Sequence, residues 1–327
     1  MKSRKNCNTS LLKDFFILQK APLLGIDISS GCIKYVGLSR RKEGFKVEAY
    51  GIKPFLVQEL SENALRDSIS HFGIRCHLAA IALKNTEVII RVLKIDATFK
   101  FYEIVEYIEA EFDNLAPYPL EEAYYDFQIM PSIQPLPRVK EILLIIARID
   151  TVQSVVSRVQ ALGFKASVVD VEQFALERAL PFALRLFREE DKLKSIAYVE
   201  VENNQLMFSY FSEMKLKFNC RKAFAGQFNN AEAQRNVIIQ QLEEMLNTKT
   251  TFPNETTKLT HLILGGELAV LPDLKESIEE KLSIPSLSAN PFVGMEISEK
   301  INLTALMADA HLLMTAFGLA LRTFDND

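Results

Sequence analysis

Apolar and polar positions along the chain predict strands and helices in a regular order. Apolar runs at 23–29, 32–40 and 45–55 are separated by short polar turns, which is typical of three antiparallel strands. The next expected elements are a helix at 59–72, strands at 78–83 and 86–96, a helix at 101–116, a strand at 139–148, a helix at 150–163, a strand at 165–172 and a helix at 173–189. The strand–helix–strand order at 139–172 predicts a parallel α/β sheet.

The same order recurs in the second half of the chain. The expected elements are strands at 195–201, 205–211 and 215–223, a helix at 230–247, a strand at 259–264, a helix at 272–283, a strand-like run at 286–292 and two terminal helices. The recurrence indicates a duplicated α/β architecture, because the element order is repeated although the sequence is not.

Composition limits the class of protein. Of the 327 residues, 48% are hydrophobic and 24% are charged, with a formal net charge of −4. These values are typical of a soluble globular protein and give no electrostatic reason to expect nucleic acid as a partner. The four cysteines are scattered without metal-ligand spacing, so reduced thiols in the cytoplasm are expected. The most apolar stretch, 305–321, is interrupted by Asp309 and His311, and it predicts a helix buried in a core.

The first 20 residues are basic and contain a cluster of apolar side chains. The apolar residues are Leu11, Leu12, Phe15, Phe16 and Leu18, and they are flanked by five basic residues. Without a small-residue cleavage site, a signal peptide is not expected. Two alternatives remain: a short helix that packs its apolar face on the body of the protein, which we favour, and a segment that lies on a membrane surface.

An acidic stretch covers residues 101–137. It contains eight Asp or Glu and no Lys or Arg. Such a run favours a solvated face, and the alternative is a docking surface for a basic partner segment. The amphipathic helix expected at 101–116 must end at the Pro-Tyr-Pro sequence that follows it.

The first two strands are joined by a polar turn in the sequence LLGIDISSGCIKYVGLSR (23–40). Its carboxylate, hydroxyls, backbone N–H groups and lysine could hold a phosphate beside a magnesium ion. An ordinary hairpin with a polar tip explains the same pattern. No P-loop, nucleophile elbow or histidine–cysteine cluster occurs in the sequence, so we predict no catalytic residue and no metal ligand.

Five sequence stretches together resemble one family. GIDISSGCIKYVGLSR, LAPYPLEEAYYDFQIM, ALGFKASVVDVEQFALERA, ANPFVGMEIS and ADAHLLMTAFGLALRTFD are similar to the PilM family of type IV pilus assembly proteins. The resemblance implies an actin-like ATPase fold, with two duplicated α/β domains around a central cleft and an FtsA-like inserted subdomain. The implied divisions are an N-terminal segment at 1–20, a first domain at 21–190 with the insertion at about 86–150, and a shortened second domain at 191–327.

The resemblance also implies a role and a location. PilM-like proteins are cytoplasmic and act at the inner face of the bacterial inner membrane, where they serve pilus assembly and twitching motility. They bind the N-terminal cytoplasmic tail of a PilN-like membrane protein, which connects them to the PilN–PilO complex and to the pilus motor or platform proteins. Tyr118, Pro119 and Leu120 in the acidic stretch are our first candidates for part of the groove that binds this tail.

An actin-like nucleotide site would need three pieces. The first hairpin carries the residue types of the first piece, namely Asp27, Ser29, Ser30, Gly31 and Lys34. Gly265 and Gly266 partly provide the third piece, which would meet the adenosine.

The second piece of the site departs from the family pattern. That pattern is similar to Asp-Ile-Gly-Ala, whereas this chain has Glu-Val-Glu-Asn at 200–203. Glu200 could still serve magnesium through a water, but Glu202 adds a carboxylate where backbone should meet phosphate. A helical excursion expected after Lys222 is missing as well.

We therefore predict a non-catalytic pilus scaffold with a degenerate or weak site for ATP and magnesium. The alternative is an ATP-binding actin-like switch or ATPase whose conformation regulates pilus assembly.

Overall fold

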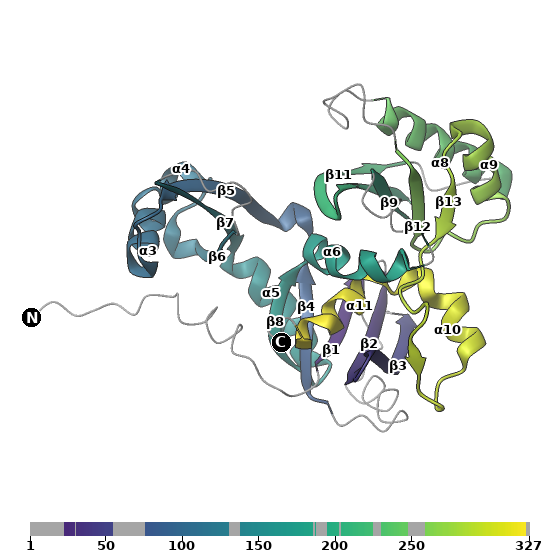
Figure 1. Cartoon of the computed structure of the whole chain (residues 1–327), viewed down its shortest axis with the longest axis horizontal. Helices are drawn as coiled ribbons and strands as arrows, with labels where there is room; N and C mark the ends of the chain where they lie inside the picture. Colours follow the sequence, from purple (N-terminus) through teal and green to yellow (C-terminus); the bar gives the residue numbers. More distant parts are fainter. Residues whose placement is uncertain are drawn as a thin grey trace, which may run out of the picture.

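The computed structural model describes residues 23–29, 31–54, 76–130, 138–185, 187, 195–202, 204–224, 230–247 and 259–324 (Figure 1). The strands of these residues form three sheets, with the orders β14-β3-β2-β1-β4-β8, β11-β10-β9-β12-β13 and β5-β7-β6. The helix expected at 59–72 and the N-terminal segment at 1–20 lie outside the described residues. The mixture of sheets and helices confirms the predicted α/β class.

The first sheet begins with the predicted meander. Its strands are β1 (Leu24–Ser29), β2 (Cys32–Arg41), β3 (Gly44–Pro54), β4 (Leu78–Leu83), β8 (Lys165–Val171) and β14 (Glu296–Ile297). Strands β1, β2 and β3 pair antiparallel, whereas β4 lies parallel to both β1 and β8. The prediction that the strand at 139–148 and the strand at 165–172 share one parallel sheet is wrong. The parallel neighbour of β8 is β4.

The second sheet repeats this arrangement. Its strands are β9 (Ile196–Val201), β10 (Gln205–Ser212), β11 (Lys215–Ala223), β12 (His261–Gly265) and β13 (Ser286–Ser288), with helices α8 (Ala231–Leu246) and α9 (Leu274–Leu282). Strand β12 lies parallel to β9, as β4 lies parallel to β1. The second meander and its parallel neighbour confirm the predicted duplication.

The third sheet and its helices lie between β4 and helix α5 (Ile149–Ala161) along the chain. The elements are β5 (Val88–Asp96), β6 (Ala123–Ile129), β7 (Val139–Arg148), α3 (Phe101–Ala110), α4 (Phe112–Leu115) and the short 3-10 turns η1 (Asn85–Glu87) and η2 (Leu120–Glu122). Helices α3 and α4 cover one face of this sheet (Figure 1). The helix predicted at 101–116 is divided in two at Glu111, whose φ of −94° and ψ of 5° leave the helical region.

The C-terminal residues return to the first sheet. Helix α11 (Met314–Ala320) packs on β1 and on α6 (Glu172–Ala183). The approach is close because a Cβ on Gly318 would lie 1.9 Å from the Ala175 carbonyl oxygen. Strand β14 also pairs with β3. These residues therefore pack with the first sheet, although the sequence analysis placed all of 191–327 in one second domain.

The apolar stretch at 305–321 is buried, as predicted, but it is not one helix. It comprises most of α10 (Leu303–Asp309), the 3-10 turn η3 (Ala310–Leu312), α11 and the start of η4 (Leu321–Phe324). Its side chains join the largest core cluster, which contacts both halves of the chain. Among the described residues no single helix is long and apolar enough to cross a membrane. The two C-terminal helical segments, Leu303–Leu312 and Met314–Phe324, meet at a bend of 99°.

Candidate functional site

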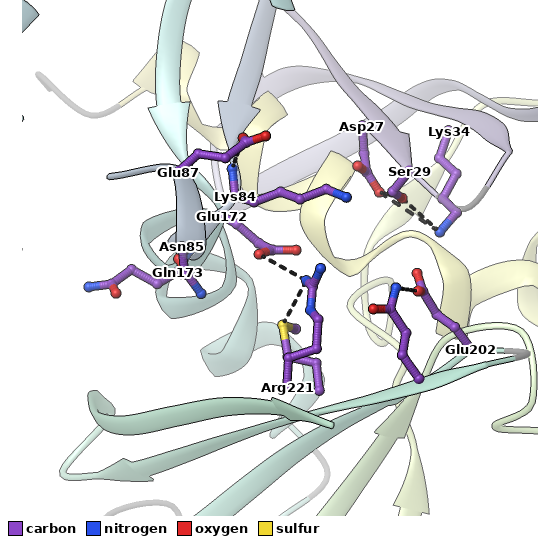
Figure 2. Close-up of polar contacts among 12 residues, drawn as sticks. Asp27, Ser29, Lys34, Lys84, Asn85, Glu87, Glu172, Gln173, Glu202 and Arg221 are labelled. Carbon is purple, nitrogen blue, oxygen red and sulfur yellow. Dashed lines mark hydrogen bonds and ion pairs between the residues drawn. The ribbon is translucent and has the colours of Figure 1, made fainter. Parts of the chain in front are cut away.

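The first hairpin brings three of its predicted site residues into contact. Asp27 on β1 stands opposite Lys34 on β2. The Lys34 Nζ lies 3.8 Å from Asp27 Oδ2 and donates a hydrogen bond of 3.3 Å to the Ser29 hydroxyl, which in turn donates to Asp27 Oδ2 at 2.8 Å (Figure 2). Gly31 turns the chain with a φ of +70°, a conformation that favours glycine. Ser30 lies outside the described residues.

Lys34 is the centre of this site. Its side chain is only 2% exposed. Burial alone would lower the pKa of its ammonium group, but the carboxylates of Asp27, Glu200, Glu202 and Glu267 raise it above the usual value. Asp27 comes from the first sheet, Glu200 from β9 of the second sheet, and Glu202 and Glu267 from the segments that follow β9 and β12. The lysine is therefore charged, and the chain itself provides its counter-ions.

Glu200 is the buried carboxyl of the second hairpin. It lies on β9 between Met207 of β10 and Gly265 of β12. Burial raises the pKa of Glu200 to about 8, although Lys34 acts in the opposite direction. At neutral pH this carboxyl is mostly protonated, and a protonated carboxyl is a poor ligand for magnesium.

Glu202 closes the second hairpin. Its backbone N–H donates to the Gln205 carbonyl oxygen at 3.0 Å, and its side chain accepts a hydrogen bond from the Gln205 amide (Figure 2). The backbone N–H is therefore used within the hairpin. A glycine at this position would let backbone approach a phosphate, whereas Glu202 adds negative charge.

The glycine pair at the end of β12 serves packing within the second sheet. A Cβ on Gly265 would lie 2.2 Å from the Tyr198 hydroxyl, and one on Gly266 would lie 2.6 Å from the Val201 carbonyl oxygen. Gly266 also has a φ of +84°, and its N–H donates to the His311 carbonyl oxygen at 3.1 Å. The space left by both missing side chains is filled by the chain itself.

An ion pair between Glu172 and Arg221 was missed by the sequence analysis. Glu172 begins α6, and its Oε2 lies 3.6 Å from the guanidinium of Arg221 on β11 (Figure 2). Burial raises the pKa of Glu172, while Arg221 opposes the shift. The pair joins the two halves of the duplicated fold. No local pattern could identify it, because the two residues are far apart in sequence.

Carboxyl groups outnumber the cations around Lys34. Five carboxyl groups influence the pKa values at this site, against the three cations Lys34, Lys84 and Arg221. Among the residues that the structure describes, no three Asp, Glu, His or Cys side chains come close enough to hold a metal ion. A polyphosphate would meet like charges, each costing about 1 kcal/mol at 4 Å in water and several times more in a partly desolvated site.

A separate hollow lies in the inserted subdomain. It is shallow and open to solvent, and its lining is Asp113, Ala116, Pro117, Tyr118 and Pro119. The Arg148 guanidinium lies 4.3 Å from the centre of the Tyr118 ring, so the ring is held in place. Two of the three candidate partner-binding residues line this hollow, while Leu120 packs against the core of the subdomain.

Comparison with known proteins identifies the relatives of this chain. The family described as type IV pilus assembly protein PilM matches residues 25–249 and 234–324. A solved structure described as a PilM–PilN type IV pilus biogenesis complex superposes with a TM-score of 0.74 at 17% identity, covering 94% of this chain and 100% of that chain.

Weaker structural matches are also found. The ethanolamine utilization protein EutJ from Carboxydothermus hydrogenoformans gives a TM-score of 0.47 at 14% identity, covering 95% of this chain and 96% of that chain. A Bacteroides thetaiotaomicron protein with an actin-like ATPase fold gives 0.45 at 12% identity, covering 98% and 100%. The fold of this chain is that of the PilM–PilN structure, which superposes much more closely than these two.

Proposed function

The chain belongs to the PilM family of type IV pilus assembly proteins, and on this premise we propose that it is a scaffold of the pilus machine with a degenerate nucleotide site. It would act through protein contacts rather than through hydrolysis of ATP. It would work in the cytoplasm, at the inner face of the inner membrane, in contact with a PilN–PilO complex and with motor or platform proteins.

One observation favours a scaffold over an ATPase. The buried Lys34 is neutralised by Asp27 and by glutamates of the second half of the fold. In an actin-like site a cation at this position would be available to phosphates. Here the chain's own carboxylates take that place and connect the two halves.

The partner that we propose is the cytoplasmic tail of a PilN-like membrane protein. A solved relative of the same fold is a complex of PilM with PilN. Cytoplasmic segments near membrane spans carry an excess of Lys and Arg. The acidic stretch at 101–137 has no Lys or Arg, and the hollow beside Tyr118 lies within it. Charge therefore supports a basic tail on this acidic surface.

A binding measurement with the partner's tail tests this function. Calorimetry would compare the full-length N-terminal tail of the PilN-like protein with a tail that lacks its first ten residues and with a scrambled tail of the same composition. We expect binding by the full tail alone. Equal binding of the truncated tail would contradict the proposed peptide recognition. Equal binding of the scrambled tail would show that the tail is held by charge attraction and not by its sequence.

A second candidate function is the ATP-dependent switch. It is favoured by the first hairpin, where Asp27, Ser29 and Lys34 keep their mutual contacts. The substitution Glu202→Gly separates the two functions. The switch predicts that the parent chain binds magnesium-ATP and that this change strengthens the binding. The scaffold predicts no binding, because Asp27 and Glu267 still neutralise Lys34.

A further inference from the structure

Large apolar side chains are exposed at the start of α3 and the end of β6. Phe101, Tyr102 and Ile129 are 53%, 56% and 50% exposed. The Phe101 ring stacks on Phe127 with 5.2 Å between ring centres, and Ile129 follows Phe127 on the same face of β6. We call these four residues the α3–β6 patch. Exposed apolar side chains that lie together on a surface offer area that a partner segment can bury.

The subdomain that carries the α3–β6 patch is acidic over residues 101–137. All eight acidic residues of 101–137 belong to the described part of the same subdomain, and three of them, Glu103, Glu106 and Glu109, lie on α3 itself. Its basic residues at this end are Lys100, which precedes α3, and Arg138 and Lys140 at the start of β7, where Lys140 donates to the Phe99 carbonyl oxygen. An occupant of this patch should therefore combine apolar side chains with positive charge.

The patch is distinct from the hollow beside Tyr118. The hollow is lined by residues that follow α3, whereas the patch lies where α3 begins. A helix of ten residues is about 15 Å long, so the two surfaces are separated by roughly the length of α3.

The chain carries a segment of the required chemistry. Residues 1–22 contain five basic residues and one acidic residue, Asp14. Their apolar residues gather in one cluster: Leu11, Leu12, Phe15, Phe16 and Leu18. The charge of this segment is opposite to that of the acidic subdomain, and its aromatic side chains match the aromatic patch.

The segment also joins the fold close to β6. The N–H of Leu23 donates to the Thr323 hydroxyl at 3.1 Å. Arg322 precedes Thr323 in the chain. Burial raises the pKa of Asp126 on β6, and the nearby Arg322 guanidinium opposes this rise. Asp126 and Ile129 are three residues apart, which is about 10 Å along a strand. Twenty-two extended residues span up to about 75 Å, so reach is not limiting.

We propose that residues 1–22 dock on the α3–β6 patch of the same chain, with the aromatic cluster on Phe101, Tyr102 and Ile129 and the lysines beside the acidic residues of α3. The acidic subdomain repels an anionic membrane, so docking there and binding to a membrane surface are alternative fates of the segment. This inference does not depend on the pilus partner, because both members of the contact belong to this chain.

Zero-length cross-linking of the full chain tests the proposal. A carbodiimide joins lysine amines to carboxylates that touch them, and mass spectrometry locates the joined peptides. An equal mixture of unlabelled and ¹⁵N-labelled chains distinguishes links within one chain from links between two. We expect links from Lys13 or Lys20 to carboxylates of α3, within one chain.

Two double variants and a control make the result specific. Phe15→Ser/Phe16→Ser and Phe101→Ser/Ile129→Ser should each reduce these links at least fivefold. Phe101 and Ile129 are about half exposed, so their replacement leaves the core intact. Asn6→Ser/Asn8→Ser changes polar positions of the same segment and should leave the links unchanged.

Three results would overturn the proposal. Links that persist in Phe15→Ser/Phe16→Ser and in Phe101→Ser/Ile129→Ser would show that charge alone brings the segment to α3. Links found only between labelled and unlabelled chains would assign the patch to a second copy. Absence of links, together with sedimentation of the chain on phosphatidylglycerol vesicles that Phe15→Ser/Phe16→Ser abolishes, would assign the segment to a membrane.

Discussion

Lys34 and Asp27 face each other across the first hairpin, with 3.8 Å between the ammonium nitrogen and a carboxylate oxygen, and Lys34 is almost completely removed from solvent. Glutamates from the second half of the fold complete the neutralisation of this lysine. The ion cluster therefore connects two halves that a nucleotide would connect in an actin-like ATPase site.

Removal of the buried lysine should destabilise the protein. Lys34→Met leaves the surrounding carboxyl groups without their central cation, and the loss of one partner from a buried ion pair costs on the order of 3 kcal/mol. Urea unfolding at pH 7 measures the change. Lys53→Met, an exposed position on β3, is the matched control and should change stability by less than about 0.5 kcal/mol.

A second substitution shows whether charge is the cause. Asp27→Asn in the Lys34→Met background removes one of the unpaired carboxylates and should recover part of the lost stability. No recovery would indicate that Lys34 acts through packing of its hydrocarbon chain instead.

Stability should fall as the pH rises through neutrality. Burial raises the pKa of Glu200 from 4.5 to about 8, so between these values the folded chain holds a proton that the unfolded chain lacks. The free energy of unfolding then decreases with pH by up to about 1.4 kcal/mol per unit, until the pH passes the folded value. Urea unfolding from pH 6.5 to 8 measures this slope, and Glu200→Gln should reduce it.

Asp126→Asn is the control for this slope. Burial raises the pKa of Asp126 only to about 6, so the decrease in unfolding free energy that it causes is complete below pH 7. This variant should keep the decrease between pH 7 and 8. An unchanged slope in Glu200→Gln would contradict the assignment of the slope to Glu200.

The glycine pair should prove to be a packing feature. In Gly265→Ala the new Cβ would lie 2.2 Å from the Tyr198 hydroxyl, and forced overpacking of this kind costs about 1–3 kcal/mol. Removing the nearest atom in Gly265→Ala/Tyr198→Phe should recover part of that loss, again by urea unfolding. A neutral Gly265→Ala would mean that the space beside the glycine is open to a ligand.

The hollow of the inserted subdomain should contribute to binding of the partner's tail. Tyr118→Ala removes an aromatic side chain from the lining of the hollow. It should weaken binding of the tail about tenfold, which corresponds to about 1.4 kcal/mol. Calorimetry with the PilN-like tail measures the effect. Val270→Ala, at an exposed apolar residue of the second half, should leave affinity unchanged. Equal affinities of Tyr118→Ala and the parent chain would place the tail elsewhere.

The parts of the fold that could be predicted from sequence are those set by neighbouring residues. Both three-strand meanders follow from apolar runs joined by short turns, and the Asp27–Lys34 contact follows from the register of one hairpin. The break at Glu111 was not predicted, because the apolar spacing of 101–116 continues through it.

Other features depend on contacts between distant segments. The apolar run at 139–148 correctly predicts a strand, but periodicity does not say which sheet the strand joins, and β7 pairs with β5 and β6. The ion pair of Glu172 with Arg221 and the Tyr198 hydroxyl beside Gly265 likewise join segments that only the folded chain brings together.

The most direct test of the degenerate cleft is the thermal unfolding midpoint with and without millimolar magnesium-ATP. A ligand at 100 times its dissociation constant stabilises a protein by about 2.7 kcal/mol, which raises the midpoint by several degrees. We predict no change, because the carboxylates around Lys34 exclude phosphate. A clear upward shift that depends on magnesium would contradict the scaffold and establish the cleft as a working nucleotide site.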